Sequence, residues 1–339
     1  MMTSMSDNCK DGVSKSNDDV CDDVNNMLQK LSTAGNEDND TSACANCGKE
    51  GSDINNICNK CKQVKYCNAA CKKKHKKKHK KDCEEYIRLA AEKHDEELFK
   101  QPPQREDCPI CFVRLPTFDE GRRYKTCCGK IICSACCYAP VFDNQGSEVD
   151  NQKCPFCRTP NHSTDEEMME REMKRVEMND PIAMYNLGNW YFKGTNGYPQ
   201  DHTKALELWH QAGKLGHALA YNNIGSAYIN GIGVKVDEKT ATYYYELAAM
   251  KGDILARKNL GNYELELDNN MDRALKHYMI AVRDGWSESL EIIKDMYSKG
   301  YATKDDYSKA LQLYQLYLSE IKSPQRDKAA ATYENCHYY

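Results

Sequence analysis

Paired cysteines constrain the possible folds of this chain more than any other feature. Sixteen of its nineteen cysteines lie between Cys44 and Cys157, and none occurs between Arg158 and Asn335. Most belong to pairs with two or three residues between their members, and such a pair closes a tight turn that directs two thiolates toward one point. Seven pairs in one segment predict structural zinc sites, because a series of pairs can complete tetrahedral shells. The pairs are Cys44 with Cys47, Cys58 with Cys61, Cys67 with Cys71, His79 with Cys83, Cys108 with Cys111, Cys133 with Cys136, and Cys154 with Cys157.

Length and charge narrow the class of protein. A chain of 339 residues has room for two or three domains, and its formal net charge of −4 argues against general binding of nucleic acid. The N-terminus has no apolar stretch of the kind that a signal peptide needs, and no apolar run is long enough to span a bilayer. We therefore expect a cytoplasmic or nuclear protein that is neither secreted nor inserted in a membrane. Reduced thiols in that setting favour zinc over disulfides.

Residues 1–43 form an acidic leader with nine acidic residues against three lysines. Asp, Asn and Ser dominate this segment, and it has no sustained hydrophobic periodicity. Such a composition predicts disorder. Cys9 and Cys21 lie outside the ligand spacing, and we expect both to be free thiols.

Residues 44–83 supply eight candidate ligands, enough for two closed zinc sites. A closed site has no open coordination position, which indicates structural rather than hydrolytic metal. The ligands are Cys44, Cys47, Cys58, Cys61, Cys67, Cys71, His79 and Cys83.

The spacing of the last ligands predicts how the two sites share them. Residues 68–82 contain no Gly or Pro, so a helix can carry Cys71, His79 and Cys83 on one face. If this helix has no kink, Cys71 and His79 lie about 12 Å apart along its axis, whereas ligands of one zinc lie within roughly 4 Å of each other. Cys71 and His79 therefore bind different metal ions. Each of the last two ligand pairs completes its site with one of the two pairs nearer the N-terminus.

These residues resemble the MYND finger, whose ligand pattern they match at every spacing, including the Tyr66-Cys67 step. Many members of that family carry Gln after the sixth ligand and Trp three residues before the histidine, and both help to hold proline-rich peptides. Here these positions are Lys72 and Lys76, so the resemblance does not include the residues that hold PxLxP-type peptides. The resemblance implies one zinc on Cys44, Cys47, Cys67 and Cys71, and a second on Cys58, Cys61, His79 and Cys83.

Lys72–Lys81 contains eight lysines and two histidines. Such a run fits a nuclear-import signal or a phosphate-contacting patch. It also fits the solvated faces of a ligand-bearing helix, and we favour that interpretation. His75 shares the ligand face but not the ligand spacing, so we expect it to lie beside the site without binding metal.

Residues 84–107 predict a helical spacer that Pro102-Pro103 ends. Residues 108–158 then resemble a RING finger in their flanking Cys-Pro-Ile-Cys and Cys-Pro-Phe-Cys pairs. The resemblance implies one zinc on Cys108, Cys111, Cys133 and Cys136.

The second zinc of this module has several candidate ligands. It would use Cys154 and Cys157, but Lys130 occupies the usual position of the ligand histidine. Cys127 and Cys128 are both candidates, although adjacent side chains diverge and would strain one tetrahedral centre. Cys137 is the alternative candidate.

Three residues of this module that are not ligands carry the functional implication of the resemblance. In RING fingers, residues at the positions of Ile110 and Pro155 face the ubiquitin-conjugating enzyme. A positive residue at the position of Arg158 braces ubiquitin against that enzyme. The alternative is that Ile110 and Pro155 only shape the zinc turns and that Arg158 is an ordinary surface charge.

Residues 159–180 predict a connecting helix with the sequence DEEMMEREMKRVE. Its N-terminus is capped either by Ser163 with Glu166 or by Thr164 with Glu167. Its methionines form a stripe that we expect to pack against the next domain.

Residues 181–322 repeat with a period near 36, and each unit predicts two amphipathic helices. One helix pair cannot bury its apolar face alone, so neighbouring pairs stack into a solenoid. The pattern resembles Sel1-like repeats in four copies, which implies recruitment of protein partners, and residues 323–339 form a tail with a capping helix. The repeated glycines are Gly188, Gly225 and Gly261 near one end of each unit, and Gly216, Gly252 and Gly285 at the other.

The predicted fold class is therefore multi-domain, with two small zinc-stabilised modules followed by an all-α solenoid of helix pairs. We expect about four zinc ions, two in residues 44–83 and one or two in residues 108–158. The expected partners are proteins, including a ubiquitin-conjugating enzyme and an unknown ligand of the solenoid, and neither nucleic acid nor membrane. We expect the solenoid to fold without the zinc modules, because neighbouring repeats supply its core.

Two functions fit this architecture. One is a RING-type ubiquitin ligase or adaptor without a catalytic cysteine of its own, and the other is a non-enzymatic zinc-stabilised interaction scaffold. A MYND-linked lysine methyltransferase would need a SET domain, and the chain contains no Asn-His-Ser-Cys motif.

Overall fold

The computed structural model describes residues 43–51, 54, 56–103, 105–139, 141–142, 148–149, 153–266, 269–333 and 336. The predicted acidic leader lies outside these residues except for Ala43. The chain forms two compact units, Met1–Lys100 and Gln101–Tyr339. The predicted fold class is confirmed, because a helical solenoid follows small cysteine-rich modules.

The first unit consists of a short hairpin and one long helix. Strands β1 (Asn56–Ile57) and β2 (Lys65–Tyr66) pair antiparallel, and α2 (Ala69–Leu98) follows. The side chain of Asn68 caps α2 by accepting a hydrogen bond from the Cys71 amide at 2.9 Å. The helix that carries the last ligands and the predicted spacer helix are thus one element of 30 residues.

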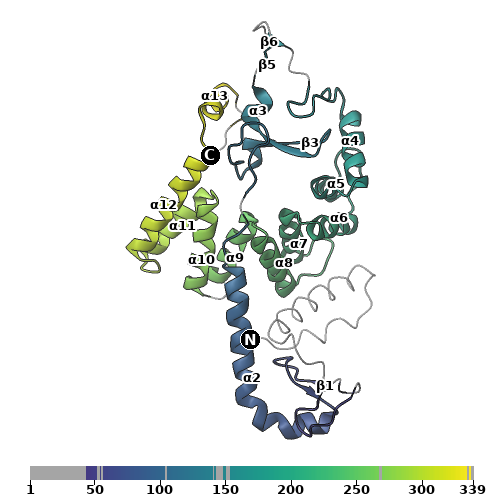
Figure 1. Cartoon of the computed structure of the whole chain (residues 1–339), viewed down its shortest axis with the longest axis vertical. Coiled ribbons are helices and arrows are strands. Elements are labelled where there is room, and N and C mark those ends of the chain that lie inside the picture. Colours follow the sequence, from purple (N-terminus) through teal and green to yellow (C-terminus); the bar gives the residue numbers. More distant parts are fainter. Residues whose placement is uncertain are drawn as a thin grey trace. The chain divides into compact units, whose positions relative to one another are not determined.

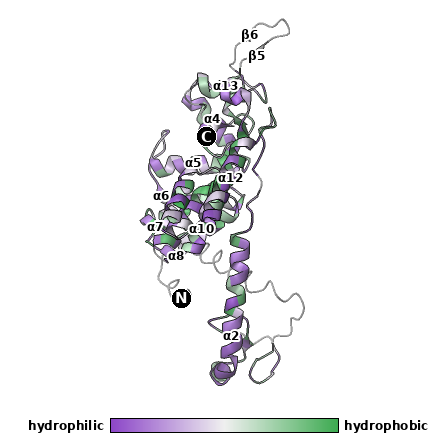
Figure 2. Cartoon of the chain, turned by 90° about the vertical axis from the view of Figure 1, so that its left-hand side faces the viewer, coloured by the Kyte–Doolittle hydropathy of each residue, from purple (hydrophilic) through white to green (hydrophobic). Residues whose placement is uncertain are grey.

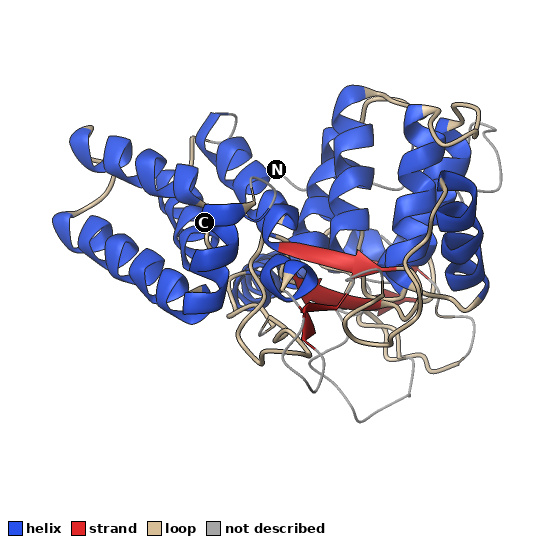
Figure 3. Cartoon of the chain, turned by 90° about the horizontal axis from the view of Figure 1, so that it is seen from above, coloured by secondary structure: helices blue, strands red, loops and turns tan. Residues whose placement is uncertain are grey.

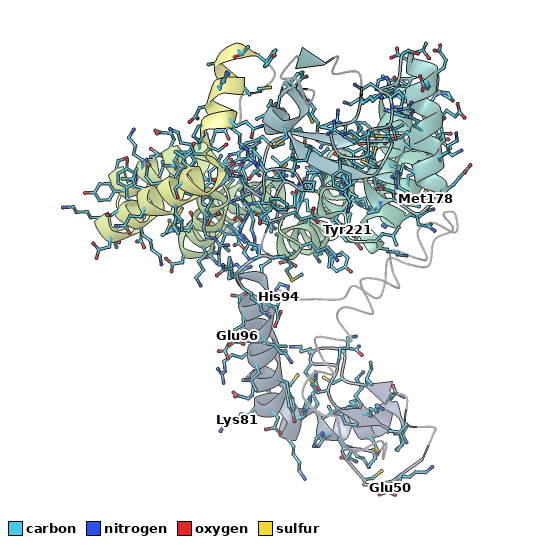
Figure 4. The ribbon with its side chains drawn as sticks, turned by 45° about the horizontal axis from the view of Figure 1, so that its top comes forward. Glu50, Lys81, His94, Glu96, Met178 and Tyr221 are labelled. Carbon is cyan, nitrogen blue, oxygen red and sulfur yellow. The ribbon has the colours of Figure 1, made fainter. Side chains whose placement is uncertain are left out.

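Helix α2 is predominantly polar (Figure 2). Only His79, Cys83 and Leu98 are buried along it. Lys81, His94 and Glu96 project from its surface (Figure 4). The two buried ligands, rather than an apolar stripe, therefore attach the first part of this helix to its module.

The second cysteine module begins the second unit. A 3₁₀ turn, η1 (Asp119–Gly121), leads into an antiparallel hairpin that aligns Arg122 with Cys133 and Lys125 with Lys130. Helix α3 follows the hairpin directly. The elements are β3 (Arg122–Lys125), β4 (Lys130–Cys133), α3 (Ser134–Tyr138), β5 (Val141–Phe142) and β6 (Glu148–Val149).

Helical hairpins stack in sequence through the rest of the unit. The connecting helix α4 (Asp165–Glu177) is capped by Thr164, whose side chain accepts from the Glu167 amide at 3.2 Å. The paired helices are α5 (Pro181–Lys193) with α6 (His202–Lys214), α7 (Ala218–Asn230) with α8 (Glu238–Met250), α9 (Ile254–Glu266) with α10 (Met271–Arg283), and α11 (Ser287–Ser298) with α12 (Lys304–Ile321), followed by α13 (Pro324–Thr332).

A glycine–aromatic contact recurs within the first three pairs. A Cβ atom placed on Gly188 would lie 2.7 Å from the ring of Trp209. Gly225 and Gly261 are equally close to the rings of Tyr245 and Tyr278, at 2.8 and 2.7 Å. These glycines are required because any side chain there would push the two helices of a pair apart.

The solenoid helices follow one another around the second cysteine module (Figure 1), and Figure 3 shows helices flanking its strands. At one end, Tyr124 Oη donates to Asp180 Oδ2 at 2.8 Å, and Arg175 Nε donates to the Thr126 carbonyl at 3.1 Å. Burial and the Asp180 carboxylate raise the pKa of Tyr124, so the phenol stays protonated and able to donate.

Further along the solenoid, the module contacts the α10–α11 turn. Thr117 Oγ1 donates to the Asp284 carbonyl at 2.5 Å, and the rings of Phe118 and Trp286 lie 5.5 Å apart. Trp286 therefore packs on the module.

Helix α13 attaches the C-terminal end of the solenoid to the same module. Arg326 is only 2% exposed, and its Nη1 donates to the carbonyls of Arg114 and Ile321, each at 2.6 Å. Its Nη2 donates to the Val113 carbonyl at 3.1 Å. Ala329 and Cys336 belong to the module's own buried core, so residues from both ends of the second unit build one core.

Candidate metal centres

The structure brings the candidate ligands of the first unit into two groups. Within each group, all ligand atoms lie within 4.8 Å of one another. Helix α2 contributes Cys71 to one group and His79 and Cys83 to the other, because His79 lies eight residue steps along the helix from Cys71. The groups are Cys44, Cys47, Cys67 and Cys71, and Cys58, Cys61, His79 and Cys83.

The distances within these groups fit tetrahedral zinc. A Zn–S bond of about 2.3 Å places two sulfurs of one tetrahedron about 3.8 Å apart. Cys47 and Cys67 have Sγ atoms 3.7 Å apart, and those of Cys58 and Cys83 are 3.8 Å apart. The His79 Nε2 atom lies 3.3 Å from the Cys61 Sγ, close to the shorter spacing that a Zn–N bond requires.

Two of the lysines on α2 stand where peptide-binding MYND fingers have Gln and Trp. Lys72 Nζ donates to the Ile57 carbonyl and to Asn59 Oδ1, both at 2.6 Å, so this lysine braces the second cysteine turn. Lys76 is exposed. His75 lies outside both ligand groups, and its Nδ1 is 3.2 Å from Tyr66 Oη.

The first group of the second module combines the hairpin and α3 with the preceding turn. Cys111 and Cys133 have Sγ atoms 3.8 Å apart, and the Cys133 amide donates to Cys108 Sγ at 3.4 Å. Two residues of the α13 segment approach these sulfurs, since Arg326 Nη2 lies 3.9 Å from Cys111 Sγ and Gln325 Nε2 lies 3.8 Å from Cys136 Sγ. The group is Cys108, Cys111, Cys133 and Cys136.

The second group of this module contains both adjacent cysteines. Cys128 Sγ lies 4.0 Å from Cys154 Sγ, and Cys127 Sγ lies 3.4 Å from Cys157 Sγ. The expected divergence of adjacent side chains applies to an extended strand, but these two cysteines occupy the tight turn between β3 and β4. A turn leaves neighbouring side chains close enough in direction to meet one centre. The group is Cys127, Cys128, Cys154 and Cys157.

The other candidates for this site do not join it. Lys130 is exposed at the start of β4. Cys137 lies outside the ligand groups of the described residues, and burial raises the pKa of its thiol to about 11. Gly129 completes the turn with φ of 67°, and a Cβ there would lie 2.8 Å from Asp180 Oδ2.

Four of the cysteine pairs close with the same backbone turn. The residue after the second cysteine has a left-handed conformation, and its amide donates to the carbonyl of the first cysteine at 2.9–3.0 Å. Only glycine adopts this conformation without steric cost. The four residues are Gly48 (φ 70°), Lys62 (56°), Phe112 (57°) and Arg158 (62°).

The residues that the RING resemblance assigns to partner binding lie on or beside these turns. Ile110 and Pro155 are half-buried, and Arg158 is exposed. Two aromatic neighbours that were not among the predicted site residues, Phe112 and Phe156, are 78% and 43% exposed. Their positions in the sequence could have indicated exposure, because each is an apolar residue within or directly after a cysteine pair.

Two regions of the chain match known families. Residues 44–83 match the MYND finger, and residues 181–217, 218–253 and 295–316 match the Sel1 repeat. Both of these predicted resemblances are confirmed. Neither region includes residues 108–158, so the RING-type interpretation of that module stays a prediction.

Short stretches of the chain are similar to two kinds of curated protein. An 88-residue stretch is 33% identical to the "ERAD-associated E3 ubiquitin-protein ligase component HRD3B" of Arabidopsis thaliana, covering 26% of this chain and 13% of that protein. A 62-residue stretch is 34% identical to "E3 ubiquitin-protein ligase GW2" of Oryza sativa subsp. indica, covering 18% of this chain and 12% of that protein. The chain thus spans about one-eighth of the length of each relative.

The solved structures that resemble the chain include proteins of the Sel1 type. The Sel1 repeat protein from Oxalobacter formigenes is 30% identical with a TM-score of 0.40, over 45% of this chain and 64% of that one. The protective antigen c5321 of uropathogenic Escherichia coli is 26% identical with a TM-score of 0.39, over 49% and 36%. Within the described part of the chain, every helix is too short or too polar to span a bilayer. The chain combines a MYND finger with Sel1 repeats, and these parts indicate zinc binding and protein–protein interaction.

Proposed function

We propose that this protein works in a ubiquitin-ligase assembly of the cytoplasm or nucleus. In this proposal, residues 108–158 form a RING-type module that docks a ubiquitin-conjugating enzyme, and the Sel1 repeats hold a protein partner. Four zinc ions, one in each ligand group, stabilise the two cysteine modules. The similarity of short stretches to a ligase and to a ligase component supports this choice of reaction.

The observation that carries the proposal is the division of the second module into a covered and an uncovered side. The β3–β4 hairpin packs on the solenoid, where Tyr124 hydrogen-bonds to Asp180. Helix α3 packs on α13, and the ring of Tyr138 stacks on that of Tyr333. The cysteine turns instead expose Phe112 and Phe156. Exposed aromatic residues that fold stability does not require are typical of a partner-binding surface.

Discharge of ubiquitin from conjugating enzymes tests the proposal. A panel of charged enzymes is mixed with the zinc-loaded full chain, and loss of the thioester is followed with time. Ile110→Ala should weaken enzyme binding about tenfold, because it removes apolar contact area without touching a ligand. Arg158→Ala should leave binding nearly intact and slow discharge, because its proposed role is to hold the reactive geometry.

Lys130→Ala is the matched control, since Lys130 is an exposed residue of the same module that is not a ligand. It should bind and discharge as the wild type does. Wild-type protein that retains zinc but discharges none of a broad panel would refute the ligase function.

The second candidate is a scaffold without enzymatic activity. One observation favours it: the second cysteine module shares its core with α13, and Arg326 hydrogen-bonds to the module's backbone. A module with this position can serve to fix the curvature of the solenoid. If the protein is only a scaffold, the Ile110→Ala and Arg158→Ala variants should capture protein partners as the wild type does. Neither the variants nor the wild type should then discharge ubiquitin from a conjugating enzyme.

A further inference from the structure

A polar cavity of about 470 Å³ lies within the second unit where four segments meet. Three of them contribute one arginine each: Arg105 from the chain before the second cysteine module, Arg114 from that module, and Arg283 from the end of α10, whereas α12 is the fourth segment. The remaining lining residues are Gln101, Pro103, Asp284, Leu316, Tyr317 and Glu320.

The carboxylates of this cavity do not fully partner its guanidinium groups. Arg114 Nη1 and Arg105 Nη2 lie 3.6 and 4.0 Å from the same Glu320 oxygen, and Arg283 Nη2 lies 3.9 Å from Asp284 Oδ1. These separations exceed hydrogen-bonding distance. Three arginines and two carboxylates line the cavity, so the lining itself has one more positive than negative group. Outside the lining, Arg114 Nε donates to Asp107 Oδ1 at 3.0 Å.

Further contacts hold Arg105 and Arg283 in place. The Arg105 guanidinium lies 4.6 Å from the centre of the Tyr317 ring, and its Nη1 donates to Thr117 Oγ1. Arg283 donates from both Nη atoms to the Gln101 amide oxygen at 3.1 Å when that amide is oriented toward it. A guanidinium has five N–H donors, so these contacts use only part of each group.

We propose that this cavity binds a phosphoryl group. Arginine presents its donors as a planar fork that matches phosphate oxygens, and three such forks around one cavity favour a multiply charged oxyanion. The source is either a phosphorylated side chain of a partner or a soluble polyphosphate. Binding would join the linker, the module and the solenoid, so it would stabilise the second unit.

Isothermal titration of the full chain at pH 7 tests the site with two probes at matched ionic strength. One probe is pyrophosphate, and the other is a phosphoserine peptide compared with its unphosphorylated form. At least one phosphoryl probe should bind, and Arg283→Gln should weaken that binding at least tenfold. Arg88→Gln should leave it unchanged, because Arg88 lies on α2 and pairs there with Glu85 and Glu92.

Binding of pyrophosphate alone identifies a soluble polyphosphate, and binding of the phosphopeptide alone identifies a modified partner. Failure of both probes, or equal binding by folded Arg283→Gln protein, would overturn the proposal.

Glu320→Gln supplies a test that does not depend on losing an arginine. The Glu320 carboxylate competes with the ligand for Arg105 and Arg114, so its neutralisation should raise affinity several-fold. A purely structural role for these ion pairs predicts no such gain. Unchanged or weaker binding by folded Glu320→Gln protein would therefore also reject the site. None of these outcomes depends on ubiquitin transfer, so the site and the proposed ligase function can fail separately.

Discussion

At the scale of single residues, the cysteine turns link metal binding to surface chemistry. Each turn forces the residue after its second cysteine into the left-handed region, where a side chain costs about 1–2 kcal/mol. Gly48 avoids this cost, whereas Phe112 accepts it and leaves its ring 78% exposed. An exposed apolar side chain in an unfavourable conformation weakens the fold, so we assign Phe112 to the proposed partner surface.

This assignment predicts that stability and binding separate at Phe112. Phe112→Gly should raise the free energy of unfolding by up to about 1 kcal/mol, because relief of the backbone conformation exceeds the entropy cost of glycine. It should also weaken binding of a conjugating enzyme. Thermal unfolding of zinc-loaded protein gives the first quantity, and Lys62→Gly, at the same position of another turn, should shift stability in the same direction. A clear loss of stability would mean that the Phe112 ring packs in solution.

A second residue makes the stability of the second unit depend on pH. Burial lowers the pKa of His217 to about 4, with Arg122 lowering it further and Asp119 and Asp180 opposing. Its Nε2 atom is buried without a hydrogen-bond partner, and its ring packs on Tyr185. Between pH 6.5 and 4 the unfolded chain binds more protons at this site than the folded one, so stability falls as pH falls.

For the wild type we expect His217 to contribute a loss of about 2 kcal/mol between pH 7 and pH 5. Zinc ligands also gain protons in acid, so the measurement is the difference between wild type and His217→Gln in denaturant unfolding at each pH. The variant should lose less stability over this interval. Equal losses in the two proteins would show that His217 is not held neutral by its burial.

At the scale of elements, helix α13 has a role that its short length does not suggest. Arg326 extends from α13 to three backbone carbonyls, two of them in the cysteine module more than 200 residues earlier. Arg326→Ala would leave these acceptors without their donor in a buried position. We expect a loss of about 3 kcal/mol in the free energy of unfolding.

Denaturant unfolding followed by tryptophan fluorescence measures this loss, since all three tryptophans lie in the solenoid at positions 190, 209 and 286. Arg88→Ala is the control, because Arg88 is an exposed arginine of the other unit. A change of less than about 1 kcal/mol for Arg326→Ala would mean that water replaces the guanidinium at these carbonyls.

The elements themselves were largely predictable from local signals. The solenoid helices follow from the repeated motif, and the side chains of Asp201 and Asp237 cap α6 and α8, the second helices of successive pairs. The ligand pairs follow from their spacing alone. The adjacent pair Cys127 and Cys128 was harder to assign, because the direction of their side chains depends on the turn between β3 and β4.

The association of elements was not predictable. It depends on contacts such as that of the Thr117 amide with Tyr317 Oη, which joins residues 200 positions apart. Neither residue belongs to a periodic pattern that marks it as an interface residue. Sequence spacing encodes local geometry and repeated contacts, whereas a single long-range hydrogen bond leaves no comparable signal.

At the scale of the whole molecule, the two cysteine modules differ in their relation to the solenoid. The first belongs to its own compact unit, and the second shares a unit and a core with the helices. We expected the solenoid to fold independently of zinc because contacts between repeats supply its core. Tyr124, Thr117 and Arg326 form additional contacts between the second module and the helices. Because of these contacts, we predict that the solenoid loses stability when the second module loses its metal.

Paired substitutions in the full chain separate the two modules. Cys154→Ser with Cys157→Ser should reduce the zinc content from four ions to three and lower the melting temperature reported by tryptophan fluorescence. Cys44→Ser with Cys47→Ser should also remove one ion but leave that melting temperature unchanged, because all three tryptophans lie in the second unit. Elemental analysis and thermal melting of the three proteins measure both quantities. Equal melting temperatures would mean that the solenoid depends only on its own repeats, and fewer than four ions in the wild type would mean that at least one ligand group does not hold zinc.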